Sequence, residues 1–125
     1  MGDTVRIYEP GAPITLTASA AVTGGADVEV SGDLTVAHPA AGDSAKIVGS
    51  AAHDAILGAD VVVFPRGSGV RKGTASGAID AGDLLKSDTG GTLTPWGTGV
   101  DDASLVVGLA LAAAADTESV TYLVL

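Results

Sequence analysis

The chain has 125 residues, of which 46% are hydrophobic and only 3% aromatic, and it contains 18 glycines and no cysteine. This length suits one domain with a modest core of small side chains, and the lack of cysteine excludes disulfides, thiolate metal ligands and a cysteine nucleophile. Six basic and fifteen acidic residues give a net charge of −9, which argues against a broad nucleic-acid surface because such a surface must be basic.

The amino-terminal segment 1–13 is predicted to be an extended arm. Pro10 and Pro13 each remove a backbone donor, and Gly11 loosens the chain between them. The segment has no basic start followed by an apolar stretch, and the longest apolar run, 105–115, is too short to cross a bilayer. These features predict a soluble, unexported protein without a membrane partner.

From residue 14 onward, short apolar or alternating segments between glycine turns predict strands. Asp54 is expected to cap one helical turn over 55–57, which Gly58 ends in a left-handed conformation. The alanines of 105–111 also suit a helix, but the match of this segment to an earlier strand favours a strand. The predicted strands lie within 14–17, 28–30, 34–36, 46–49, 61–64, 70–74, 84–85, 93–94, 105–111 and 120–125.

One pattern occurs twice along the chain. Val48-Gly49-Ser50-Ala51, nine residues and an apolar strand recur without a gap from Val107-Gly108-Leu109-Ala110. The preceding segment 21–28 also recurs, one residue shorter, as 78–84. Repeats specify architecture, so the sequence predicts an all-β fold, a small barrel or sandwich built from two similar halves. The halves are 21–64 and 78–125 within a single domain 14–125, joined by a connecting loop 65–77.

Catalytic or metal-binding clusters are not predicted. His38 and His53 are too few for a zinc centre, and Asp80, Asp83, Asp88, Asp101 and Asp102 lack the spacing of a calcium loop. We therefore predict no catalytic residues, no metal, no cofactor and no enzyme activity.

One short segment keeps an enzyme alternative open. Ser76-Gly77-Ala78-Ile79-Asp80 resembles part of the uracil-pocket motif of trimeric dUTP pyrophosphatases. That family places a tyrosine a few positions after the aspartate, whereas 81–84 reads Ala-Gly-Asp-Leu here. A degenerate nucleotide hydrolase is the less favoured reading.

Two further features are candidates for contact with a partner. Arg66, Arg71 and Lys72 are half of the six basic residues and lie within seven positions of one another. They either dock on an acidic protein surface by charge complementarity or form a solvated loop. Trp96 is the single tryptophan and is a candidate oligomer-interface residue or surface platform.

From Ser44 onward, ordered blocks of the sequence resemble the capsid decoration, or cement, proteins of tailed bacteriophages. The blocks are 44–55, 69–72, 75–83 and 107–114. The resemblance implies a homotrimer, made in the host cytoplasm, that binds the outer surface of the mature phage head and stabilises contacts between subunits of the major capsid protein, without touching nucleic acid.

In that family the amino-terminal segment typically meets the shell. The resemblance therefore implies that the arm orders on binding, by adding a strand to a capsid edge. The capsid-contact candidates are Val5, Arg6, Ile7, Tyr8, Glu9 and Pro10, together with Arg66, Arg71 and Lys72.

A carbohydrate-binding or adhesin β module displayed on a virion is the alternative from a different class. Sugar-binding modules usually present exposed aromatic rings. In this chain Trp96 is the plausible platform, so this alternative depends on the exposure of one side chain.

Overall fold

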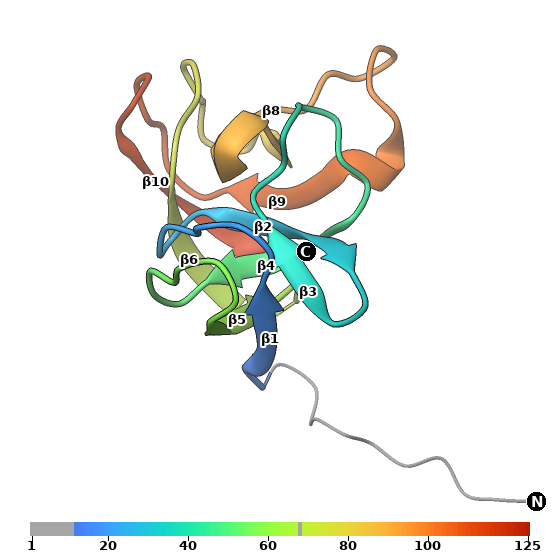
Figure 1. Cartoon of the computed structure of the whole chain (residues 1–125). Coiled ribbons are helices and arrows are strands. Elements are labelled where there is room, and N and C mark those ends of the chain that lie inside the picture. Colours follow the sequence, from blue (N-terminus) through green and yellow to red (C-terminus); the bar gives the residue numbers. More distant parts are fainter. Residues whose placement is uncertain (1–11, 68) are drawn as a thin grey trace, which may run out of the picture.

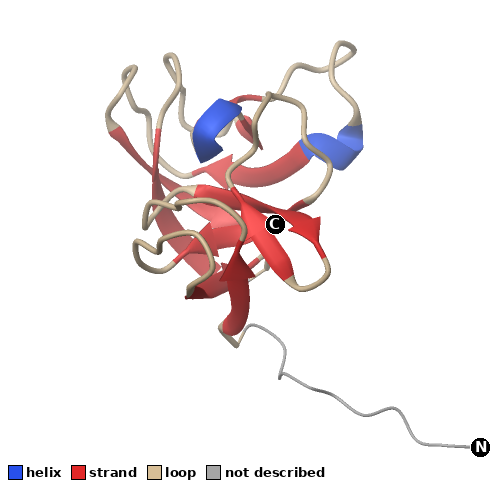
Figure 2. Ribbon diagram, viewed as in Figure 1, coloured by secondary structure: helices blue, strands red, loops and turns tan. Residues whose placement is uncertain are grey.

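The computed structural model describes residues 12–67 and 69–125, and within them the chain is all-β, as predicted (Figure 1, Figure 2). The first half, residues 14–65, forms a closed barrel in the order β1-β3-β2-β4-β5. The ten predicted strands, five in each half, occur in the predicted order. The strands are β1 (Ile14–Ala18), β2 (Asp27–Gly32), β3 (Thr35–Ala37), β4 (Ile47–Ala51) and β5 (Asp60–Pro65).

The second half, residues 69–125, is a five-stranded sheet in the order β6-β10-β9-β7-β8. Its turns gather at the end of the molecule opposite β1, in yellow, orange and red in Figure 1. No described helix is long and apolar enough to cross a membrane. The elements are β6 (Gly69–Thr74), β7 (Leu84–Ser87), the 3-10 turn η1 (Thr89–Gly91), β8 (Leu93–Pro95), the 3-10 turn η2 (Ala103–Leu105), β9 (Val106–Ala110) and β10 (Ser119–Val124).

The two halves repeat the same pairing plan, strand for strand. The bridge Val22↔Ala55 corresponds to Ile79↔Ala114 in the second half. The parallel β1–β3 ladder, which closes the first barrel, corresponds to a single parallel bridge, Ala75↔Leu93. The second sheet is therefore a barrel of the same design whose last seam consists of one bridge.

Two sequence predictions need correction. The segment 65–77 is not a connecting loop, because β6 occupies its centre and pairs with β10 along six residues. The repeated unit thus starts with β1 and β6, which makes each copy longer than 21–64 and 78–125. Residues 55–57 form no helical turn, because Ala55 pairs with Val22 instead. Gly58 does adopt the predicted left-handed conformation, with φ 84°.

The repeated glycine marks a close approach between neighbouring strands. A Cβ on Gly49 would lie 2.9 Å from Pro65 Cα, and a Cβ on Gly108 would lie 3.0 Å from Leu123 O. Only glycine leaves this space for the adjacent backbone. The Val-Gly-x-Ala block therefore repeats because the fold requires it.

Each half has its own small hydrophobic core. The first is built mainly from alanine and valine, with Val28, Val36, Val61 and Val63 fully buried. The second contains larger side chains, including Leu85 and Tyr122, and it also takes Ile47 from β4 of the first half. Ile47 is thus an apolar link between two otherwise separate cores.

Candidate functional site

Of the three basic residues predicted as contacts between positions 66 and 72, two make hydrogen bonds within the fold. Arg66 donates from Nη2 to Val106 O at 2.5 Å and from Nε to Leu125 O at 3.2 Å, so it ties the link between the halves to the second sheet. Arg71 donates from Nη2 to Pro65 O at 2.6 Å, and its guanidinium lies 5.3 Å from the centroid of the Phe64 ring. Lys72, by contrast, is exposed on β6.

The arm candidates Val5 to Pro10 lie outside the described residues. Their assignment as shell contacts therefore stays a prediction. Within residues 12–67 and 69–125, the geometry separates Lys72, which is free to meet a partner surface, from Arg66 and Arg71, whose hydrogen bonds connect parts of the domain.

Trp96 is half-buried and follows β8 directly. Its Nε1 donates to Asp102 O at 2.8 Å, and its backbone nitrogen donates to Leu84 O at 2.7 Å. The indole therefore anchors the loop 97–102 of the second half, and because Trp96 is half-buried only part of its surface is open to a ligand.

Both histidines connect neighbouring backbone segments. His38 donates from Nδ1 to Asp27 O at 2.7 Å and accepts at Nε2 from the Thr23 nitrogen at 2.8 Å. His53 donates from Nδ1 to Asp54 O at 2.8 Å and accepts at Nε2 from the Val62 nitrogen at 3.2 Å. Each imidazole uses both ring nitrogens in this way, which gives it a structural role.

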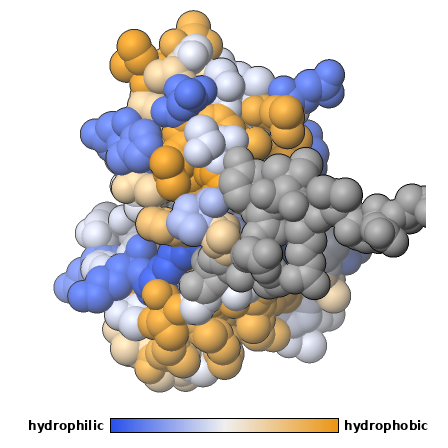
Figure 3. All heavy atoms as spheres, turned by 90° about the horizontal axis from the view of Figure 1, so that it is seen from below, coloured by the Kyte–Doolittle hydropathy of each residue, from blue (hydrophilic) through white to orange (hydrophobic). Residues whose placement is uncertain are grey.

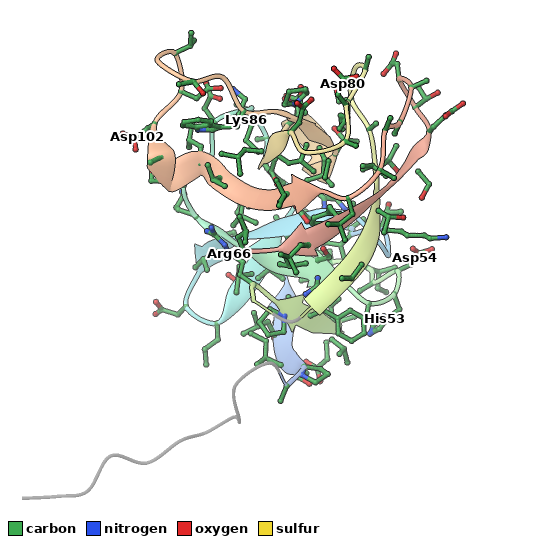
Figure 4. The ribbon with its side chains drawn as sticks, turned by 180° about the vertical axis from the view of Figure 1, so that it is seen from behind. His53, Asp54, Arg66, Asp80, Lys86 and Asp102 are labelled. Atoms are coloured by element: carbon green, nitrogen blue, oxygen red, sulfur yellow. The ribbon has the colours of Figure 1, made fainter. Side chains whose placement is uncertain are left out.

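The aspartates of the second half are distributed over separate turns (Figure 4). Asp83 accepts from the Asp80 nitrogen at 2.9 Å. Asp88 and Asp102 cap the two 3-10 turns. In the described part of the chain, no group of three or more acidic, histidine or cysteine residues is arranged to hold a metal ion.

The residues of the dUTP-pyrophosphatase-like segment also have local partners. Ser76 Oγ donates to Asp88 Oδ2 at 2.9 Å, and Ile79 is buried in the second core. Ser76 and Asp80 therefore have structural roles, since each makes a hydrogen bond to a neighbouring turn residue of the second half.

Asp27, which sequence reasoning missed, is a buried carboxylate between the two halves. It accepts from Ser50 Oγ at 2.9 Å on its own side and from Ser87 Oγ of the second half. Burial raises the pKa of Asp27, while the hydrogen bonds from the two serines act in the opposite direction. Burial and the nearby Asp27 also raise the pKa of Tyr122 to about 12. Tyr122 OH lies 3.4 Å from Ser50 Oγ.

Lys86 makes a second polar connection between the halves. Its Nζ lies 2.6 Å from Asp43 Oδ1 in the first half and 2.9 Å from Asp101 Oδ1 in the second. These hydrogen bonds raise the pKa of Lys86. The backbone adds Gly90 N donating to Pro39 O at 2.9 Å, so the interface between the halves is largely polar.

An open groove of about 480 Å³ lies in the first half, beside the turn that precedes β5. We call it the first-half groove. Sequence reasoning missed it because its two sides come from segments about thirty residues apart. Its apolar lining includes Val22, Ala55, Ile56 and Ala59, and Asp54 and Asp60 supply acidic groups.

Comparison with known proteins identifies a shared fold. No protein-family model matches the chain, and no curated protein matches it significantly. Among solved structures, the chain is similar to the base of the head fibre of bacteriophage phi29, described as head fiber gp8.5 N base, with a TM-score of 0.67 and 24% sequence identity. The match covers 91% of this chain and 93% of that chain. The two proteins therefore share their fold over nearly their whole described length.

Proposed function

We propose that the chain is a structural virion protein that binds the exterior of a mature phage head and stabilises contacts between subunits of the major capsid protein. The observation that carries this proposal is the fold shared with the phi29 head-fibre base along almost the full length of both chains. The ordered sequence blocks that resemble capsid decoration proteins point in the same direction.

The physical character of the chain supports an external position. A net charge of −9 disfavours close contact with packaged DNA and suits a surface that faces solvent. The described polar clusters connect turns and the two halves to each other. We assign the protein no catalytic step, and we expect a homotrimer in which several weak contacts to the shell act together.

The arm is the first proposed shell contact. Residues 5–10 combine Val5, Ile7 and Tyr8 with Arg6, and main-chain hydrogen bonds to an exposed strand edge would offset the entropic cost of ordering such a segment. Lys72 is a second candidate, because its ammonium group is exposed on β6. Arg66 and Arg71 act indirectly, by holding the domain together.

Cosedimentation with purified, expanded heads that lack this protein tests the function. We expect the full chain to pellet with heads to saturation and to raise the temperature at which the heads release their DNA. A variant lacking residues 2–12 should show the same circular dichroism spectrum and remain in the supernatant. A full chain that stays in the supernatant would contradict the proposal, and binding by the shortened chain would remove the arm from it.

A further inference from the structure

The turn beside the first-half groove exposes two large apolar side chains in succession. Ile56 is 75% exposed and Leu57 is 68% exposed. Single exposed apolar residues are common on protein surfaces, but an adjacent pair next to an apolar groove is the arrangement found at interaction sites. Viewed from below, Figure 3 shows apolar side chains in several patches on this face of the molecule, separated by hydrophilic side chains.

The second half provides an internal control, because it contains the same turn without these side chains. Ala115, Asp116 and Thr117 correspond to Ile56, Leu57 and Gly58. The turns share their backbone bonds: Gly58 N donates to Ala18 O at 2.8 Å, and Thr117 N donates to Ala75 O at 2.9 Å. Since alanine and aspartate support the same turn, the fold does not require isoleucine and leucine there.

The walls of the groove differ between the halves in the same sense. Ala59 and Thr23 line the first-half groove, whereas the corresponding residues of the second half are Glu118 and Asp80. The first half therefore has uncharged side chains at these two positions, and its acidic groups at the groove are Asp54, which accepts from Gly24 N at 2.8 Å, and Asp60. A complementary ligand is apolar and carries a positive charge that meets these carboxylates.

We propose that the first-half groove and the Ile56–Leu57 turn bind an extended apolar segment with one lysine or arginine, contributed by the shell protein. This inference rests on the proposed function and adds a second contact to that of the arm. Charge complementarity selects the occupant, because this acidic chain repels further acidic surfaces and Asp60 is exposed at the edge of the groove. Two contacts at different places on one body allow each copy to connect neighbouring shell subunits.

The test compares Ile56→Asp/Leu57→Asp with the matched variant Ala115→Asp in the second half, using heads that lack this protein. Both sites are exposed, so both variants should unfold at the wild-type temperature. We expect Ile56→Asp/Leu57→Asp to weaken binding to heads at least about tenfold and Ala115→Asp to bind as the wild type does. Asp60→Lys should also weaken binding, and high salt should reduce the difference between Asp60→Lys and the wild type.

The outcomes separate this inference from the proposed function. If the wild type does not bind heads, both fail. If the wild type binds and Ile56→Asp/Leu57→Asp binds equally well, the groove assignment alone is wrong. If the variant instead dissociates an oligomer of the free protein in sedimentation velocity, the occupant is a second copy, and the shell segment is overturned. Should the aspartates lower the unfolding temperature, Ile56→Ser/Leu57→Asn supplies the same comparison with neutral side chains.

Discussion

The two halves of the molecule share a backbone plan and differ in how they close and what they expose. The first barrel closes through the parallel β1–β3 ladder, and the second closes through one bridge, Ala75↔Leu93. The first half exposes Ile56 and Leu57 on a turn where the second half has alanine and aspartate. The shared residues specify the barrel, so the residues that differ are where interaction with other molecules is to be sought.

The contacts between the two halves are mostly polar. Ile47 makes an apolar contact between the halves. The polar side-chain contacts between them include the Asp27–Ser87 hydrogen bond, the Lys86–Asp43 ion pair and the hydrogen bonds of Arg66 to Val106 O and Leu125 O. Such contacts depend on direction as well as proximity. They therefore constrain the relative orientation of the two small cores.

Replacing the repeated glycine should distinguish the halves most strongly. A Cβ at Gly49 would lie 2.9 Å from two backbone atoms of Phe64 and Pro65, whereas at Gly108 it first meets the ring of Tyr122, at 2.5 Å. A ring can shift more readily than a paired strand. We expect Gly49→Ala to lower the free energy of unfolding by at least about 3 kcal/mol, and Gly108→Ala to cost less, as measured by urea denaturation. Equal losses would show that Tyr122 is as rigidly held as the β5 backbone.

Replacing the cations should separate structural residues from surface residues. Arg66→Met removes the donors to Val106 O and Leu125 O, so we expect a loss of roughly 1–2 kcal/mol in the free energy of unfolding. The matched variant Lys72→Met changes an exposed side chain and should leave stability unchanged. Thermal melts followed by circular dichroism measure both. A stable Arg66→Met variant would return Arg66 to the candidates for direct contact with a partner.

The smallest effect concerns Asp27 and depends on pH. Its pKa is raised in the folded chain above the ordinary value of 3.8 because the carboxyl is buried, so the folded state holds this proton more tightly than the unfolded state. The resulting stabilisation is present below pH 3.8 and is lost as the pH rises through the folded pKa. Asp27→Asn mimics the protonated form. Its unfolding temperature relative to the wild type should therefore increase from acidic to neutral pH.

Asp33→Asn removes an exposed carboxylate and is the matched control for the loss of one negative charge. The effect is small because Ser50 and Ser87 donate to the carboxylate and offset part of the cost of burial. A constant temperature difference between Asp27→Asn and the wild type would contradict the raised pKa.

The order of strands could be predicted because it depends on short-range pattern. Val61 to Phe64 is a continuous apolar run, and Val120 to Leu125 is apolar except for Thr121. The gapless repeat identified β9 as a strand despite its alanines. Strand β6 was partly hidden because it contains two glycines and two basic residues, and its identity depends on pairing with β10, about fifty residues away.

The site residues were harder to predict, because their partners are distant in sequence. Asp27 receives bonds from serines 23 and 60 positions away, and an aspartate before a strand otherwise looks like a turn residue. The acceptors of Arg66 are backbone carbonyls. Every residue has a backbone carbonyl, so the sequence does not indicate which ones accept. The groove was detectable in principle, because aligning the two copies exposes the exchange of Ile56-Leu57 for Ala115-Asp116.

In each half the first and last strands are neighbours. Ile14 pairs with Val63 along β1 and β5, and Gly69 pairs with Val124 along β6 and β10. The entry and exit of each unit therefore lie side by side, and only residues 66–68 separate one unit from the next. A unit with adjacent ends can be joined in tandem, or cut and reconnected elsewhere, without breaking its sheet. The molecule is thus organised as a fused pair of similar units, each with its own core and its own closure.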